Sequence, residues 1–322
     1  MTDAATGQFC MLEDYALVRV QGADAADFLQ AQLINDLSAL SPDRHQLSGW
    51  CNPKGRLLAV LRVFRDRKRW FLRLPTELLA PTLQRLRMFV LRARVELQPL
   101  EGRWSGMALW GPAAADGLRA AGLPAPAGTD TAVWHQETAV LQVPGRRFEL
   151  WGPADALRAV ADACAAAGFG AAPRTAWELE EIRAGLPEVY AATREQFVPQ
   201  TLNMDLIGAL SFTKGCYPGQ EIVARTRYLG KLKRRMYRLR ATAPETQAGA
   251  TIYRPERSGT DPAGTVVRWA PAEEGIVELL ASLRVEDAEA GGLRLADPAG
   301  PALERLPLPY AVTVEQDPTG HS

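Results

Sequence analysis

The sequence contains little material for a metal site. Among its 322 residues are four cysteines and three histidines. The cysteines, Cys10, Cys51, Cys164 and Cys216, are far apart and none belongs to a C-x-x-C pair. This spacing argues against a zinc site or a self-held iron–sulfur cluster, so we expect no metal ligands. Dispersed free cysteines are also typical of proteins from the reducing cytoplasm.

The chain has no excess of charge of either sign, because 37 basic residues balance 37 acidic ones. The molecule as a whole is therefore not expected to bind polyanions. The balance is uneven along the chain: residues 54–94 contain twelve basic residues against two acidic ones, and residues 214–240 contain nine against one. Such blocks are either solvated faces or places that attract an anionic ligand.

Long hydrophobic runs are also missing. No stretch approaches the roughly 20 apolar residues that span a bilayer, and residues 1–14 lack a basic region followed by an apolar run. We therefore expect a cytoplasmic protein with no membrane partner. The composition, 47% hydrophobic and 23% charged, is that of an ordinary globular protein, and the length allows two or three domains.

The first hundred residues have the pattern of a mixed α/β or α+β layer. The N-P-K-G sequence at residues 52–55 predicts a hairpin turn between two strands. Apolar periodicity predicts strands at residues 15–20, 48–51, 57–64, 70–74 and 93–98, and helices at residues 25–33 and 78–89.

The remainder of the chain predicts two further modules. A Gly/Ala/Pro stretch at residues 168–173 is a candidate boundary. Strands are expected at residues 107–110, 131–141 and 147–151, and helices at 154–167 and 177–184. Short β-like runs at residues 236–241, 251–254, 264–269 and 275–280 alternate with turns, which predicts a small antiparallel barrel or sandwich.

Cys216 precedes a predicted helix start at Pro218, and Lys214, Arg225 and Arg227 are close to it in the chain. The positive end of the helix dipole and these cations favour the thiolate over the thiol, which predicts a reactive sulfur. The alternative for such a residue is a small buried cysteine that packs under the helix. The local chemistry leaves both interpretations open.

The longer segment is more specific. Residues 214–221, K-G-C-Y-P-G-Q-E, resemble the K-G-C-Y-x-G-Q-E hallmark of the YgfZ-type folate-binding family, which is related to the glycine-cleavage T-protein, an aminomethyltransferase. The resemblance extends over most of the chain, and residues 98–174 match only loosely. Other matching blocks are at residues 22–24, 28–32, 52–56, 184–187, 197–200 and 306–310.

The resemblance implies a folate ligand, tetrahydrofolate or a one-carbon derivative. Family members place one aromatic residue just before the first strand and another before the A-G-I-P helix; these positions are Tyr15 and Trp177 here. Gln200 and Asn203 are the implied polar contacts. A pterin is a flat polar ring that needs an aromatic partner and hydrogen-bonding groups around its edge. Without the resemblance, both aromatic residues would be interpreted as core.

The sequence departs from the aminomethyltransferases where those enzymes carry acidic residues. Ala59 and Val60 stand in the place of an Asp pair, and Arg183 replaces the folate-facing Glu, while Glu180 and Glu181 are out of register. Without a placed carboxylate, general acid–base catalysis lacks an agent. We therefore expect an accessory protein rather than a glycine-cleavage enzyme.

Two alternatives stay open. The chain could be a folate-dependent one-carbon transferase or demethylase, with Cys216 as nucleophile and Lys214 as a second catalytic residue. It could also bind nucleic acid through the basic run at residues 231–240, where Tyr237 is interleaved. A solvated strand edge or a partner-docking face is the more ordinary account of that run, so direct nucleic-acid binding is not expected.

These observations predict an α+β, discontinuous, T-protein-like fold. Residues 1–97 with 173–235 would form the folate-binding body, residues 98–172 an inserted α/β module, and residues 236–322 a C-terminal antiparallel β-barrel. Folate would occupy a central channel, with the Cys216 loop at its rim. The resemblance implies a role in assembly, maintenance or repair of iron–sulfur cluster enzymes, including tRNA-modifying ones, which would be its partners.

Overall fold

The computed structural model describes residues 7–228, 232–256 and 261–313. By its contacts the chain falls into two compact units. Unit 1 comprises residues 1–30, 36–47 and 61–177, and unit 2 comprises residues 31–35, 48–60 and 178–322. The strands β3 and β4 each contribute residues to both units. The three-part division expected from the sequence stays a prediction.

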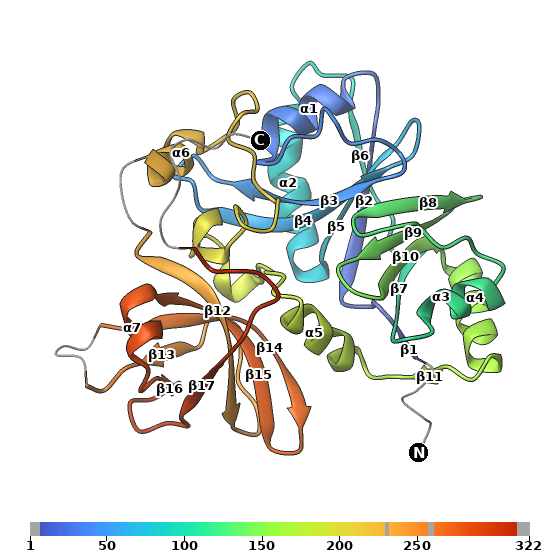
Figure 1. Ribbon diagram of the computed structural model, residues 1–322. Coiled ribbons are helices and arrows are strands. Elements are labelled where there is room, and N and C mark those ends of the chain that lie inside the picture. The colour runs from blue at the N-terminus through green and yellow to red at the C-terminus, as the bar shows by residue number, and fades with distance from the viewer. Residues whose placement is uncertain (1–6, 229–231, 257–260, 314–322) are drawn as a thin grey trace. The chain divides into compact units, whose positions relative to one another are not determined.

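A five-stranded sheet carries the first hundred residues, in the order β3-β4-β5-β2-β6 (Figure 1). The predicted strands, both helices and the hairpin order are confirmed, with small shifts of their ends. In the register, Tyr15 pairs with Pro75 and Val20 pairs with Trp70, so β2 and β5 run antiparallel. The elements are β2 (Tyr15–Gln21), α1 (Ala25–Gln32), β3 (His45–Cys51), β4 (Leu57–Arg65), β5 (Trp70–Pro75), α2 (Leu79–Val90) and β6 (Glu96–Pro99), with a 3-10 turn η1 (Thr76–Leu78) before α2.

A second, six-stranded sheet in unit 1 has the order β11-β1-β7-β10-β9-β8. Alternate residues of its strands point to opposite faces, so Met107 and Leu109 pack beneath the two helices α3 and α4, which lie together beside this sheet in Figure 1. The elements are β1 (Gln8–Met11), β7 (Trp104–Trp110), α3 (Ala114–Ala120), β8 (Thr131–His135), β9 (Thr138–Val143), β10 (Arg147–Pro153), α4 (Ala154–Ala166) and β11 (Gly170–Ala171).

The aromatic core of unit 1 contains side chains from strands of both sheets. Ala108 and Trp110 of β7 belong to it, together with Phe64 and Phe71 of the five-stranded sheet. The rings of Phe64 and Phe71 stack with their centroids 5.2 Å apart. Burial of such large apolar rings is the main source of free energy for this unit.

Unit 2 contains the third sheet, in the order β16-β13-β14-β15-β12-β17, which curls into an antiparallel half-barrel (Figure 1). Its strands are β12 (Arg234–Thr242), β13 (Thr251–Tyr253), β14 (Gly264–Glu273), β15 (Ile276–Arg284), β16 (Arg294–Leu295) and β17 (Leu303–Leu306). Helix α5 (Arg174–Arg183) has residues in both units, and the helical elements of unit 2 are α6 (Gln220–Tyr228), α7 (Val285–Ala290) and the 3-10 turns η2 (Ala191–Thr193) and η3 (Pro199–Leu202). None of the described helices is long and apolar enough to cross a membrane.

Some sequence-based expectations were wrong in detail. The single strand expected at residues 131–141 is the hairpin β8–β9, whose turn contains Gln136 at φ 52°. Helix α6 begins at Gln220, after Gly219 at φ 82°, and not at Pro218. The elements β1, α3 and α7 were not predicted, because each is only four to seven residues long.

Candidate functional site

Cys216 is the accessible thiol of this protein. The other three cysteines are buried and Cys216 is exposed. Burial raises the pKa of Cys10 to about 12 and that of Cys164 to about 11, and it also raises the pKa of Cys51. Because a thiolate is the reactive form, these three are held as inert thiols at neutral pH. Cys216 lies in the loop before α6, and its activation stays a prediction.

Lys214 fixes this loop from within unit 2. Its side chain is buried, and Nζ donates to the carbonyl oxygens of Leu33 at 2.5 Å and Asn35 at 3.1 Å. The ammonium group also lies 5.5 Å from the ring centroid of Tyr217. Lys214 therefore anchors the backbone beside Cys216, and its catalytic role stays a prediction.

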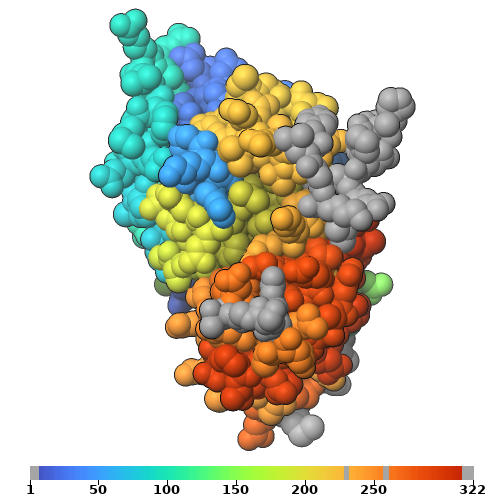
Figure 2. All heavy atoms as spheres, turned by 90° about the vertical axis from the view of Figure 1, so that its left-hand side faces the viewer, coloured from blue at the N-terminus to red at the C-terminus, as the bar shows by residue number. Residues whose placement is uncertain are grey.

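Gly219 allows the same loop to pack closely against the N-P-K-G turn of residues 52–55. It has φ 82°, and a Cβ there would lie 2.5 Å from the carbonyl oxygen of Asn52 and 2.7 Å from the Cα of Gly55. Only glycine permits that approach without displacement of the backbone. Figure 2 shows the blue surface around residue 50 beside the orange-yellow surface of residues 210–225. Two blocks of the family resemblance thus meet in unit 2.

We expect native protein to take up one equivalent of iodoacetamide, at Cys216. The three buried thiols are shielded and protonated, so they should react only on unfolding. Mass spectrometry of digests from the wild type and from Cys216→Ala would locate the label. Rapid native labelling of Cys10, Cys51 or Cys164 would contradict this expectation.

Gln200 and Asn203 connect elements of unit 2, and both are completely buried. Gln200 Nε2 donates to the carbonyl oxygen of Val223 at 2.6 Å, which ties η3 to α6. Asn203, at φ 58°, exchanges two hydrogen bonds with the backbone of Met236, at 2.8 and 3.0 Å. Sequence reasoning missed this bridging role. Their contact with folate stays a prediction.

Tyr15 and Trp177 are brought into one buried aromatic cluster in unit 1. Trp177 is 1% exposed, and its ring centroid lies 5.6 Å from that of Trp110 at an angle of 52°. The guanidinium carbon of Arg147 lies 5.0 Å from the ring centroid of Trp177. An arginine over an indole face is a favourable cation–π pair.

Tyr15 has the same kind of environment. The guanidinium carbon of Arg73 lies 4.2 Å from the centre of its ring, and that of Arg174 lies 5.0 Å away. Arg174 also pairs with Asp14 at 2.6 Å. Both guanidinium groups lie over the buried ring of Tyr15, and guanidinium groups are suited to bind a carboxylate such as the anionic tail of a folate.

Glu149 is a buried carboxylate at the centre of this arginine cluster. Its Oε1 lies 3.1 Å from Nε of Arg62 and 3.6 Å from Nη2 of Arg73, and its Oε2 accepts a hydrogen bond from Nε1 of Trp151 at 3.1 Å. All four side chains are almost fully buried. The sequence carried a signal for this network, because Arg62 and Arg73 stand between apolar neighbours inside their strands.

His45 is held neutral beside this network. Burial, followed by the charge of Arg62, lowers the pKa of its imidazole to about 3. His45 Nε2 lies 3.0 Å from the carbonyl oxygen of Gln142. His45 is therefore not a proton donor at neutral pH.

This depressed pKa predicts loss of stability in acid. Between about pH 6.5 and pH 3, His45 is protonated in the unfolded chain but not in the folded protein, so stability falls as the pH falls, by up to about 1.4 kcal/mol per pH unit. Urea unfolding between pH 7 and pH 4 should give a shallower dependence for His45→Gln than for the wild type. The exposed His135→Gln is the control, and parallel wild-type and His45→Gln curves would refute the prediction.

The positions that lack the acidic residues of aminomethyltransferases have other partners. Ala59 and Val60 are fully buried in β4. Arg183 pairs with Glu278 at 3.1 Å and with Glu180 at 3.4 Å. None of these contacts leaves a carboxylate free for proton transfer.

The other carboxylates of α5 also serve an ion-pair network in unit 2. Glu178 accepts hydrogen bonds from Arg268 at 2.5 Å and from the hydroxyl of Tyr190 at 3.1 Å. Glu181 is 3.7 Å from the same arginine. Both carboxylates are therefore buried and held by the guanidinium group of Arg268.

The basic run at residues 231–240 is largely neutralised. Lys231 lies outside the described residues. Three arginines of the run have carboxylate partners: Arg235 with Asp205 at 2.6 Å, Arg238 with Glu278 at 2.6 Å and Arg240 with Glu304 at 2.8 Å. Paired guanidinium groups are poor phosphate ligands, which weakens the nucleic-acid hypothesis for this run. Within the described ranges, no three His, Cys, Asp or Glu side chains are grouped to hold a metal ion.

The GCVT N-terminal domain family matches residues 10–138 of the chain. Over 312 residues the chain is 30% identical to the tRNA-modifying protein YgfZ of Yersinia pestis, covering 95% of this chain and 93% of that protein. An uncharacterized protein of Haemophilus influenzae is 29% identical over 309 residues, 95% of this chain and 99% of that protein.

Among solved structures, the glycine cleavage system aminomethyltransferase T from Bartonella henselae aligns with a TM-score of 0.76. The alignment covers 94% of this chain and 85% of that chain, at 19% sequence identity. This likeness is one of fold. The mixed α+β architecture expected from the sequence is therefore similar to that of an aminomethyltransferase.

Proposed function

The chain belongs to the YgfZ family. We propose that it is a cytoplasmic, tetrahydrofolate-binding accessory protein for the assembly, maintenance or repair of iron–sulfur cluster enzymes. Its clients would include enzymes that modify tRNA, as the name of the Yersinia relative, tRNA-modifying protein YgfZ, suggests. The observation that carries the proposal is an exposed Cys216 in an intact K-G-C-Y-P-G-Q-E segment, in a chain without the carboxylates of the aminomethyltransferases.

Folate binding draws support from unit 1. Tyr15 and Trp177 share one aromatic cluster bordered by Arg73, Arg147 and Arg174. A pterin beside this cluster, with its anionic tail near the guanidinium groups, follows ordinary recognition chemistry. The central folate channel and the contacts from Gln200 and Asn203 are parts of this proposal. When bound, the folate would supply or accept a one-carbon group.

A second candidate is a folate-dependent one-carbon transferase or demethylase that uses Cys216 as nucleophile. The exposure of Cys216 and the anchoring of its loop by Lys214 favour it. The ion-paired state of Glu178 and Arg183 disfavours it, because proton transfer lacks a free carboxylate. Formation of methylene-tetrahydrofolate from an aminomethyl donor by the wild type, and not by Cys216→Ala, would establish this second function.

The accessory function is tested by deletion of the gene and rescue. We expect deletion to lower the activities of iron–sulfur enzymes in the same cells, and the wild type and Cys164→Ala to restore them. Cys216→Ala, expressed at equal level, should restore little, because its exposed thiol is the candidate reactive group. Unchanged enzyme activities after deletion would refute the accessory function. Full rescue by Cys216→Ala would assign Cys216 a structural role.

A further inference from the structure

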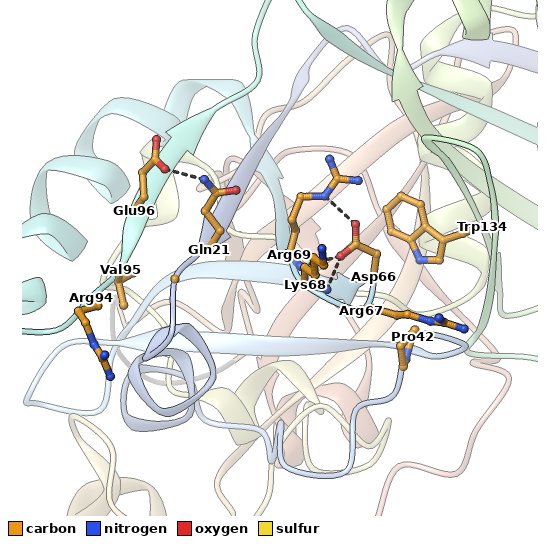
Figure 3. Close-up of a pocket in the computed structure, with 11 residues that line it drawn as sticks. Gln21, Pro42, Asp66, Arg67, Lys68, Arg69, Arg94, Val95, Glu96 and Trp134 are labelled. Atoms are coloured by element: carbon orange, nitrogen blue, oxygen red, sulfur yellow. Dashed lines mark hydrogen bonds and ion pairs between the residues drawn. The ribbon is translucent and has the colours of Figure 1, made fainter.

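A pocket of about 1000 Å³ lies in unit 1 at the turn between β4 and β5 (Figure 3). Its wall includes Gln21, the last residue of β2, whereas Tyr15 is the first residue of the same strand. Six steps along a strand cover roughly 20 Å. The pocket is therefore centred away from Tyr15, although Trp134, one of its lining residues, packs against the same core cluster.

Asp66 builds the turn that forms one side of the pocket. Its carboxylate accepts hydrogen bonds from the backbone amides of Lys68 at 2.7 Å and Arg69 at 2.6 Å, and from Nε of Arg69 at 2.6 Å. Burial alone would raise the pKa of Asp66, but these hydrogen bonds hold it below its usual range. The turn is consequently preformed at neutral pH.

Arg67 and Lys68 at the tip of this turn are exposed cations. Among the residues that the structure describes, no carboxylate pairs with either side chain, since Asp66 is occupied by Arg69 and by backbone amides. They are held next to each other on a fixed turn, and Figure 3 shows both at the pocket. Two adjacent unpaired cations on a rigid turn attract a phosphate or carboxylate group.

The opposite wall of the pocket is backbone. Gly22 has φ 124°, and a Cβ there would collide with the carbonyl of Arg94, so the backbone at Gly22 and Arg94 packs closely. Asp24 holds the wall in place, because it accepts hydrogen bonds from the amide of Arg94 at 2.8 Å and from its Nη2 at 2.9 Å. Gly22, Arg94 and Val95 line this wall.

Trp134 supplies an aromatic surface in the same pocket. Its ring centroid lies 6.1 Å from that of Phe64 and 5.4 Å from that of Phe71, and its Nε1 donates to the carbonyl oxygen of Arg65 at 2.9 Å. These contacts fix a half-buried indole whose remaining surface lines the pocket (Figure 3). A fixed indole costs little entropy when it stacks with a planar ligand.

The pocket also has polar groups suited to the edge of a heterocycle. Nε2 of Gln21 donates to Oε2 of Glu96 at 2.6 Å. This pairing holds both side chains in place at the pocket (Figure 3). The amide oxygen of Gln21 and the second carboxylate oxygen of Glu96 take no part in this hydrogen bond. Such oxygens accept hydrogen bonds from exocyclic amino groups.

We propose that this pocket binds a nucleotide. The base stacks on Trp134 and faces the backbone wall of Gly22, while its phosphate contacts Arg67 and Lys68. An acidic peptide would satisfy the cations but would leave the indole without a planar partner, so the chemistry favours a nucleotide. The nucleotide is either free or an unpaired residue of single-stranded RNA, where base stacking and phosphate contacts combine in the same way. The proposal goes beyond the folate-linked function and does not depend on it.

The test uses the whole chain with two probes, AMP in calorimetry and a short fluorescent single-stranded oligoribonucleotide in anisotropy. The variant is Arg67→Glu/Lys68→Glu, whose positions are exposed and tolerate replacement. We expect binding at least about ten-fold weaker, because both cationic contacts to the phosphate are lost. For the oligonucleotide, the slope of log affinity against log salt should fall by about 0.7 per lost contact.

The matched control is Arg119→Glu/Arg158→Glu, which reverses two exposed arginines on α3 and α4 of the same unit. This control should bind both probes as the wild type does. Affinity for AMP that depends on Arg67 and Lys68 identifies a free nucleotide, and affinity for the oligonucleotide alone identifies RNA.

The proposal would be overturned if neither probe binds, if the turn variant binds like the wild type, or if a poly-glutamate peptide competes as well as the nucleotide. Displacement of the probe by tetrahydrofolate would also overturn it, because the two ligands would then share one site. These outcomes leave the rescue experiment untouched, so the two proposals fail separately.

Discussion

Replacement of Trp177 by alanine should abolish most tetrahydrofolate binding. Trp177 is 1% exposed and packs against Trp110 and Arg147. Because the ring is already covered by these neighbours, its loss acts by loosening the cluster around Tyr15, and we expect roughly ten-fold weaker binding, about 1.4 kcal/mol. The cavity should also lower the free energy of unfolding by about 3–5 kcal/mol. Titration calorimetry with tetrahydrofolate and urea unfolding measure the two effects.

Trp70→Ala is the matched control for Trp177→Ala. Trp70 is also buried in unit 1, and it pairs with Val20 near the far end of the strand that begins at Tyr15. Its loss should reduce stability by a similar amount and leave folate affinity unchanged. Equal loss of folate affinity in both variants would show that Trp177→Ala weakens binding only because it destabilises the protein. No saturable binding by the wild type would remove the folate proposal.

Replacement of Glu149 by leucine should lower the free energy of unfolding by about 3–5 kcal/mol, because it removes one partner of a buried ion pair. Arg62 and Arg73 would lose the carboxylate between them. The position of Arg73 over the ring of Tyr15 should change as well, so folate affinity should fall together with stability. Chemical unfolding and calorimetry on the same preparation give both values.

Glu137→Leu provides the comparison for Glu149→Leu. Glu137 also pairs with an arginine, Arg69 at 3.4 Å, but its side chain is 61% exposed. An exposed ion pair contributes about 0–1 kcal/mol, so this variant should unfold almost as the wild type does. Similar losses of unfolding free energy from both substitutions would show that burial does not determine how much the Glu149 ion pair contributes to stability.

The sequence was most informative where a pattern is local. Alternation of apolar residues located the strands around Tyr15 and Trp70, and residues 214–221 indicated the family. It did not predict contacts between residues that are distant in the chain. Nothing local indicates that Tyr15 and Trp177, 162 positions apart in the chain, share one cluster, or that Lys214 donates to the carbonyl oxygen of Leu33.

Some errors came from weak local signals. The turn at Gln136 contains neither glycine nor asparagine, so the β8–β9 hairpin looked like one strand. The hydrogen bonds of the Asn203 amide to the backbone of Met236 had no local signal either, because the position of Asn203 in a family block indicated only a ligand contact, which stays a prediction. Buried side-chain amides often serve the backbone in this way, and the sequence does not distinguish the two uses.

Strands β3 and β4 each have residues in both units, and this affects how the chain can fold during synthesis. Leu57, at the start of β4, donates its amide to the carbonyl of Phe197 and accepts from the amide of Glu195. A ribosome adds the intervening residues in a time on the order of ten seconds. For that period β4 can pair only with its sheet neighbours β3 and β5, and the backbone groups of Leu57 lack their partners at residues 195 and 197. Nascent chains of this protein should therefore be clients of chaperones until residue 197 has emerged.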